Sequence, residues 1–167
     1  MKKLYGQRGF TLIEIISVIV VMSIIGVIAG MSLLKITEGF VFAKKNAATA
    51  QKGQIAMARL AKELNSVKFI SSNTWTTISS GTGTSITLTR KVGATTTTFT
   101  IDQSGSNLRV GGDILVDNVN TFELKYYSAY NGSGSSTYSS VASMIEISLK
   151  LTGADNVISE FLDRITL

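Results

Sequence analysis

The sequence predicts an α+β protein in which one long N-terminal helix packs on a C-terminal antiparallel β-sheet. Two observations predict this class. The first is an unbroken apolar run over residues 10–34, which continues into an amphipathic helical segment over residues 35–68. The second is a sharp change over residues 69–167 to Ser-, Thr- and Gly-rich sequence with short alternating apolar stretches. The 167 residues therefore suffice for one membrane-spanning helix and one modest domain.

The apolar run is long enough to cross a membrane, and Glu14 is its only charged residue. A helix rises about 1.5 Å per residue, so the run covers roughly 37 Å, more than the ~30 Å of a hydrocarbon core. Basic residues precede the run, and the dipeptide Gly9-Phe10 lies at its start. An ordinary secretory signal is cleaved after its apolar region. Cleavage at Gly9-Phe10 would instead remove residues 1–9 and leave the apolar segment on the mature protein.

The segment Gln7-Arg8-Gly9-Phe10-Thr11-Leu12-Ile13-Glu14 resembles the leader and cleavage site of type IV pilins and of type II secretion pseudopilins. In that family a membrane aspartyl peptidase cuts after the glycine, and the new amino terminus is N-methylated. The resemblance implies cleavage after Gly9, N-methylation of Phe10 and a role of Glu14 in subunit assembly. It also implies the pilin fold and three kinds of protein partner: prepilin peptidase, other pilins or pseudopilins, and an inner-membrane assembly platform.

Two interpretations of Glu14 stay open. A carboxylate at the middle of a bilayer costs about 2.5–3.5 kcal/mol, but Glu14 lies near the membrane face and could reach the headgroups. Alternatively, it pairs with the amine that cleavage creates at Phe10, on its own or a neighbouring subunit. Packed helices in a filament exclude water, so an unpaired charge there is costly. Such a pair would set the axial stagger between subunits.

Positive charge is concentrated in the segment that follows the apolar run. Residues 35–68 hold seven basic and two acidic side chains, a net charge of +5, whereas residues 69–167 have a net charge of −2. This pattern favours a solvated helix face beside anionic lipid over nucleic-acid binding, because interleaved aromatic residues are few. Three basic residues precede the run and four lie in residues 35–54, so the positive-inside rule does not orient the span. The resemblance does: it places the leader in the cytoplasm and the head in the periplasm.

Beyond Leu34 an apolar stripe predicts that the helix continues to about residue 67. The stripe recurs in steps of three and four residues, with Gln54 at one place and with Gly39 and Gly53 as weak helix formers. Within the span, Gly26 and Gly30 have the GxxxG spacing of close helix packing, or are simply glycines that the bilayer tolerates. The stripe consists of Ile36, Phe40, Ala43, Ala47, Ala50, Met57, Ala61 and Leu64, and is widened by Val41, Ala48 and Ile55.

Alternating residues predict eight strands after a turn at Ser71-Ser72-Asn73. Short connections favour an antiparallel meander, with one face on the helix stripe and the far face wet. The long irregular stretch 128–140 is either a disordered tip or a contact loop carried by Tyr130 and Tyr138. The predicted strands are residues 75–78, 86–92, 97–102, 108–110, 114–116, 119–127, 144–152 and 157–166.

The head resembles one subgroup of the family more loosely. Residues 114–127, Ile-Leu-Val-Asp-Asn-Val-Asn-Thr-Phe-Glu-Leu-Lys-Tyr-Tyr, are similar to the C-terminal half of the J-type minor pseudopilin and its minor-pilin counterparts. The helical segment 59–64 is similar to that subgroup as well. This resemblance implies a minor subunit.

The composition gives little support to catalysis or cofactor binding. Cys and His are absent, so thiolate or imidazole nucleophiles, bases and metal ligands are excluded. Asp113 and Asp117 could share a Ca²⁺ ion, as could the loop after Asp102, but ordinary turn chemistry explains both sites. We therefore expect no enzyme activity, no cofactor and no resident metal.

The sequence as a whole predicts a structural subunit of a type IV pilus or type II secretion pseudopilus. It would wait in the inner membrane as a single-pass protein in contact with lipid, and then be moved into a filament. The alternative is an ordinary signal-anchored protein whose β head binds a ligand. The amino terminus discriminates between them: N-methyl-phenylalanine at Phe10 supports the first, and an intact Met1 supports the second.

Overall fold

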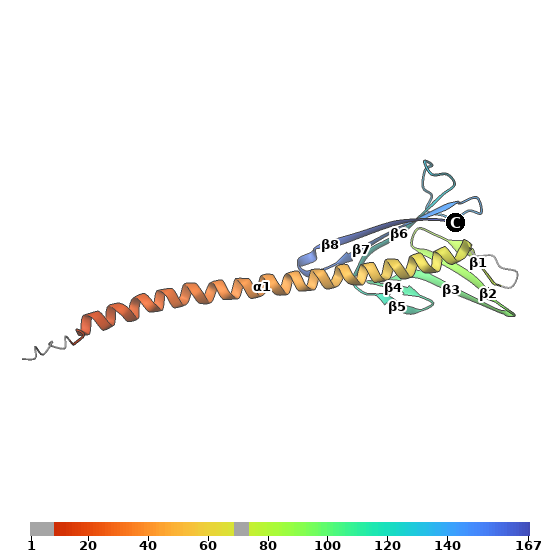
Figure 1. The fold of residues 1–167 in the computed structure, drawn as a ribbon. Helices are drawn as coiled ribbons and strands as arrows, with labels where there is room; N and C mark the ends of the chain where they lie inside the picture. The colour runs from red at the N-terminus through yellow and green to blue at the C-terminus, as the bar shows by residue number, and fades with distance from the viewer. Residues whose placement is uncertain (1–8, 69–73) are drawn as a thin grey trace, which may run out of the picture. The chain divides into compact units, whose positions relative to one another are not determined.

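The computed structural model describes residues 9–68 and 74–167. Contacts between residues divide the chain into two compact units, Met1–Ala43 and Lys44–Leu167. The described part of the first unit is mainly the beginning of a long helix, and the second unit combines the end of that helix with β-strands (Figure 1). The expected α+β class is confirmed. The leader up to Arg8 and the turn expected at residues 71–73 lie outside the described residues.

The helix α1 runs over Leu12–Asn65 and is followed by one 3₁₀ turn, η1, at Ser66–Lys68. Its first half is helical because the apolar run contains no proline, and its second half is rich in Ala, Lys, Gln, Glu and Leu, which are strong helix formers. At its C-terminal end, the Ser66 hydroxyl donates a hydrogen bond to the Glu63 carbonyl, which satisfies one of the last acceptors of the helix.

All eight predicted strands are present, and every strand pair is antiparallel. They form two sheets, not the single sheet that the sequence predicted. Sheet order follows chain order in both, so the predicted meander is confirmed within each sheet. The five-stranded sheet comprises β1 (Thr74–Gly81), β2 (Ser85–Val92), β3 (Thr95–Ser104), β4 (Asn107–Val110) and β5 (Asp113–Val116); the three-stranded sheet comprises β6 (Val119–Tyr127), β7 (Met144–Thr152) and β8 (Ile158–Thr166), with a 3₁₀ turn, η2, at Ala154–Asn156.

The break between the sheets lies at the connection from β5 to β6. Asn118 has a φ of 56°, a left-handed conformation that asparagine tolerates better than most residues and that turns the chain sharply. β6 then pairs with β7, and its other edge is closed by three turn and loop carbonyls and by the Gln103 side chain of β3. Four amides of β6 donate to these groups: Val119 to the Ser106 carbonyl (2.9 Å), Phe122 to Gln103 Oε1 (2.9 Å), Leu124 to the Gly83 carbonyl (2.7 Å) and Tyr126 to the Ser135 carbonyl (2.8 Å).

The core of the head lies where the last turns of α1 meet both sheets (Figure 1). Leu60 and Leu64 of the helix are buried together with Phe122 of β6 and Ile147 of β7. Each such side chain removed from water contributes about 1.5–3 kcal/mol, so this contact between helix and sheets stabilises the head.

The buried face of α1 differs from the predicted stripe. Met57 and Leu64 are buried as predicted, but Ile55 is 61% exposed, and Ile36 and Phe40 are exposed as well. The predicted stripe omitted Ala56 and Leu60, which are buried, and the buried face also includes a glycine and a glutamate, which an apolar pattern does not count. The buried residues of the helix are Gly53, Ala56, Met57, Leu60, Glu63 and Leu64.

Gly53 is buried because another residue fills the space that its own side chain would take. A Cβ at this position would overlap the ring of Phe161 in β8. Gly53 has a low helix propensity, but its missing side chain allows the helix and the three-stranded sheet to approach closely.

One end of the far face of the three-stranded sheet is dry, contrary to the prediction of a wet face. Glu146 of β7 is buried and accepts a hydrogen bond from the Arg164 guanidinium of β8 at 2.6 Å. The Arg164 guanidinium lies 5.1 Å from the ring centre of Tyr127, within cation–π range. The buried carboxylate is thus paired, which is what burial of a charge requires.

Residues 128–140 form a folded loop on the head. The amide of Tyr126 donates to the Ser135 carbonyl at 2.8 Å, and the Ser135 amide donates back to the Tyr126 carbonyl at 2.9 Å. The Tyr138 ring packs edge-on against the Tyr126 ring, with centroids 5.6 Å apart. Tyr138 therefore anchors the loop from inside, whereas Tyr130 is exposed.

Candidate functional site

The peptide bond expected to be cleaved is open to an enzyme. Gly9 and Phe10 precede the first helical turn, and both are exposed. A Cβ at Gly9 would meet nothing within 4 Å, and Phe10 is 79% exposed. A peptidase needs accessible backbone at the scissile bond, and this position, outside the helix and exposed, provides it. The preceding Arg8 lies outside the described residues.

Glu14 sits in the first turn of α1. The Thr11 carbonyl accepts hydrogen bonds from the Glu14 amide (3.1 Å) and the Ile15 amide (3.3 Å), which makes Thr11 the N-cap residue. Thr11 and Glu14 therefore have the spacing of a capping box, S/T-x-x-E, and the helix dipole favours a carboxylate in this turn. The sequence contains this signal, but we interpreted Glu14 from the sequence as a residue of subunit assembly and as a charge near the membrane face, not as part of a helix cap.

The helix surface beside Glu14 is apolar. An open groove runs from Glu14 along the next three turns and is lined by Val18, Val21, Met22 and Ile25 together with Ser17. The Ser17 hydroxyl donates to the Ile13 carbonyl at 2.8 Å, so its donor is satisfied within the helix. The groove thus offers apolar surface with one carboxylate at its N-terminal end, a surface suited to packing against another helix.

The rest of the apolar segment is also suited to a non-aqueous environment. α1 is the one helix among the described residues that is long and apolar enough to cross a membrane, and none of its most apolar window is buried within the protein. Two more serines donate back to carbonyls four residues earlier, Ser23 to Ile19 (2.7 Å) and Ser32 to Ile28 (2.9 Å). Such bonds satisfy hydroxyls where water is absent.

The glycines at positions 26 and 30 face open space. A Cβ at either position would meet nothing within 4 Å. Close packing of another helix at this GxxxG face stays a prediction.

Residues 4–33 match a family model described as "Prokaryotic N-terminal methylation motif". The chain carries a prepilin-type N-terminal motif. The matched range includes Gly9, Phe10 and Glu14, and it supports the type IV pilin and pseudopilin family and a prepilin-peptidase substrate. Together with the long apolar helix, it indicates a membrane-anchored pilin. No curated protein and no solved structure matched the chain.

Two of the carboxylates considered as Ca²⁺ ligands have other partners. Asp117 accepts hydrogen bonds from Lys52 Nζ at 2.7 and 3.0 Å, and this bond to Lys52 lowers the pKa of Asp117. Asp102 forms an ion pair with Arg109 across β3 and β4. Asp113 is exposed, and the described residues contain no group of three or more side chains suited to hold a metal ion. The ion pairs of Asp102 and Asp117 join elements of the head.

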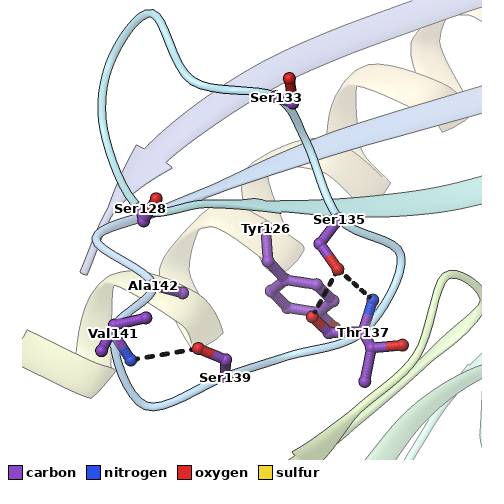
Figure 2. A pocket seen from close by; sticks show the side chains of 8 residues that line it. All are labelled: Tyr126, Ser128, Ser133, Ser135, Thr137, Ser139, Val141 and Ala142. Atoms are coloured by element: carbon purple, nitrogen blue, oxygen red, sulfur yellow. Dashed lines mark hydrogen bonds between the residues drawn. The ribbon is translucent and has the colours of Figure 1, made fainter.

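The head has a small hollow under the 128–140 loop (Figure 2). Its volume is about 280 Å³, and most of its lining side chains are hydroxyls. The Ser135 hydroxyl donates to the Thr137 carbonyl (3.0 Å) and accepts from the Thr137 amide (3.1 Å), and Ser139 Oγ accepts from the Val141 amide (3.3 Å). These hydroxyls hold the loop in shape. The lining residues are Tyr126, Ser128, Ser133, Ser135, Thr137, Ser139, Val141 and Ala142.

Tyr126 lines this hollow and is hydrogen-bonded to the turn between β1 and β2 of the five-stranded sheet. Its hydroxyl donates to the Thr82 carbonyl at 3.2 Å, and burial raises its pKa above the ordinary value. The phenol is therefore a neutral structural donor at physiological pH. The hollow brings together hydroxyls and an aromatic ring without a charged side chain among its lining residues.

Proposed function

We propose that the chain is a non-enzymatic structural subunit of a type IV pilus or a type II secretion pseudopilus. Prepilin peptidase cuts after Gly9 at the cytoplasmic face, and Phe10 is N-methylated. The mature protein spans the inner membrane once, with its head in the periplasm, until the assembly platform moves it into a filament. The observation that supports this proposal most is the methylation motif at the start of a helix whose apolar surface is exposed all round.

Glu14 is the residue that links processing to assembly in this proposal. Cleavage creates an amine at Phe10, four residues before the carboxylate. Within a bundle of packed helices both charges lose water, and each is stabilised only by the other. In a single subunit, the first helical turn already favours the carboxylate. A neighbouring subunit would add the partner for its amine.

A minor role in the filament rests on a separate observation. Residues 114–127, which resemble the J-type minor pseudopilin, form the end of β5, the sharp turn at Asn118 and the whole of β6. Counting copies of this subunit against the other subunits in purified filaments tests that assignment. A number close to that of the major subunit would contradict it.

Replacing Glu14 tests the filament function. Glu14→Ala removes a charge from the apolar run, so membrane insertion should be unimpaired, and cleavage should persist because Gly9-Phe10 is unchanged. The variant should be processed, stay in the inner membrane and be depleted at least tenfold from sheared filaments, with Glu14→Asp intermediate. Glu38→Ala, which removes an exposed carboxylate of the same helix beyond the run, is the matched control. Wild-type amounts of the Glu14→Ala variant in sheared filaments would show that Glu14 is only a surface charge.

A second candidate is a signal-anchored protein whose head binds a ligand. The hollow of about 280 Å³ under the 128–140 loop favours it, because hydroxyl-lined hollows can hold small polar molecules. The Ser135 and Ser139 hydroxyls among its lining groups already bond to the loop backbone, and the Tyr126 hydroxyl bonds to the Thr82 carbonyl. The first candidate is better supported because residues 4–33 match the methylation motif. An intact Met1 on the purified membrane protein would favour this second candidate.

A further inference from the structure

The head carries an apolar groove outside its core. It has a volume of about 390 Å³ and lies between α1 and β5, with Ile55, Ile114 and Leu115 among its lining residues. Ile55 is 61% exposed and Ile114 is 63% exposed, although both lie in the compact head unit. Large apolar side chains gathered in one exposed groove mark an interaction surface more often than a solvated one.

An ion pair fixes the two walls of this groove. Lys52 of α1 lies one helical turn before Ile55, and Asp117 follows the last residue of β5. The Nζ of Lys52 is 2.7 Å from the Asp117 carboxylate. Because both side chains are among the lining residues, the pair holds the helix wall and the strand wall together. The groove is thus present before any partner arrives.

A second exposed apolar surface lies on the N-terminal unit beyond the apolar run. Ile36 and Phe40 are each 68% exposed and are spaced i, i+4, which places them on one face of α1. They follow Leu34, the last residue of the run that fits a bilayer. Hydrocarbon therefore does not account for their exposure, and we name this pair the Ile36/Phe40 ridge.

We propose that the Ile36/Phe40 ridge of one copy packs into the Ile55/Ile114/Leu115 groove of a neighbouring copy. The charges beside the two surfaces agree with this contact. Lys44 lies four residues after Phe40, on the same face of α1 as the ridge, whereas Asp113 precedes Ile114 at the groove and is exposed. The contact thereby brings a cation of α1 to the end of β5 that carries Asp113.

This proposal rests on the proposed filament function and adds to it which surfaces of successive subunits meet. The ridge and the groove are different surfaces, so the contact is heterologous: each copy can accept one neighbour and offer itself to another. Such contacts form open, helical assemblies unless the rotation closes a ring. The proposal requires that copies of this subunit follow one another in the filament, whether the subunit is minor or major in total amount.

The absence of cysteine from the sequence makes a direct test possible. Phe40→Cys and Ile114→Cys are made in separate chains that are produced together in the native host, and the membranes are oxidised. A disulfide forms only when the two Cα atoms come within about 7 Å. We expect a mixed dimer when both variants are present, and a ladder of multimers from one chain that carries both cysteines. As the control, Phe40→Cys is combined with Tyr130→Cys, on the exposed part of the 128–140 loop. This pair should give at most one tenth of the mixed dimer that Phe40→Cys forms with Ile114→Cys.

Two outcomes would overturn the proposal. Mixed dimers no more abundant than with Tyr130→Cys would mean random collision. Dimers of Ile114→Cys with itself, without mixed dimers, would mean a symmetric contact. A second variant, Ile114→Glu, should fold because this side chain is exposed, and should lower the amount in sheared filaments at least threefold. If Phe10 is methylated and filaments contain the chain but the crosslink is absent, the groove proposal fails and the proposed function stands. If Phe10 is not the amino terminus, the proposed function fails.

Discussion

Large apolar side chains are exposed in the N-terminal segment and buried in the core of the head. All large apolar side chains from Phe10 to Leu34 are exposed, whereas Leu60, Phe122 and Ile147 in the head are almost completely buried. The difference lies in how apolar residues are arranged along the sequence. In the head, apolar residues alternate with polar ones and find partners within the same chain, while in the segment they follow one another and cover the whole helix. The head therefore buries its own apolar surface, and the segment requires lipid or neighbouring helices.

This contrast predicts a separation of effects. Changes in the N-terminal segment should alter processing or assembly without unfolding the head, and changes in the head core should alter stability without blocking cleavage. For each variant, both the processing and the stability of the chain can be measured. A change in the N-terminal segment that unfolds the head, or a change in the head core that blocks cleavage, would contradict this separation.

The largest effect is expected at the cleavage site. Gly9→Val places a β-branched side chain next to the scissile bond, at a position where a Cβ would meet nothing within the protein itself. Folding of the chain should be unchanged, while cleavage should be lost almost completely. Gel migration and N-terminal sequencing measure this. Gly39→Val, the same change at another exposed glycine beyond the motif, should be processed normally, and normal processing of Gly9→Val would contradict the assignment of the site.

The next effect concerns the buried carboxylate of the head. Glu63 is 6% exposed and forms ion pairs with Arg59 (3.0 Å) and Arg90 (2.5 Å). Glu63→Ala leaves the partly buried Arg90 without its carboxylate partner and should lower the free energy of unfolding by about 2–4 kcal/mol. Chemical denaturation of the detergent-solubilised chain, followed by circular dichroism, measures it.

The matched control removes an exposed carboxylate. Glu160→Ala breaks the pair with Lys150 on the surface of the three-stranded sheet and should cost less than about 1 kcal/mol. Equal costs for the two variants would show that the buried position of Glu63 does not matter. Cleavage at Gly9 should be unaffected by either change.

A smaller effect is expected where the helix approaches β8. Gly53→Ala improves helix propensity by about 1 kcal/mol, yet its Cβ would overlap the Phe161 ring. The overlap should win, with a net loss of about 1–2 kcal/mol in the free energy of unfolding. In a double-mutant cycle, Phe161→Leu should remove most of the loss caused by Gly53→Ala. A stabilised Gly53→Ala variant would mean that helix and sheet are not closely packed at this point.

The smallest effect depends on pH. Lys52 lowers the pKa of Asp117 in the folded protein, so the pair contributes stability above the unfolded pKa of about 4 and loses it as the pH falls through the lowered value. Both side chains are half exposed, so the contribution should be about 0.5 kcal/mol or less at pH 7. Asp117→Asn should therefore be slightly less stable than the wild type at pH 7 and equal to it at pH 2. A difference that persists at pH 2 would contradict an electrostatic cause.

The sequence predicted the strands well because apolar and polar residues alternate along each strand and turn residues lie at its ends. It did not predict that the strands divide into two sheets, since that depends on the left-handed turn at Asn118 and on groups such as the Gln103 side chain of β3 that close the edge of β6. These are contacts between residues distant in sequence, and periodicity does not report them. The same holds for Gly53, whose role is visible only beside Phe161.

The candidate site was predictable for a different reason. Gly9, Phe10 and Glu14 form a local motif, and residues 4–33 match the N-terminal methylation motif without any help from the head. The sequence also offered a partner for Glu14, the amine that cleavage would create at Phe10. That pairing stays a prediction, because it requires a cleaved chain and neighbouring helices.

The amino terminus of the chain, purified from membranes of the native host, tests the central claim most directly. Mass spectrometry of the N-terminal peptide should show a chain that begins at Phe10, with the mass of one added methyl group on its amine. Residues 1–9 should be absent. A chain that begins at Met1, or one cut behind the apolar run at Leu34 or beyond, would contradict the account.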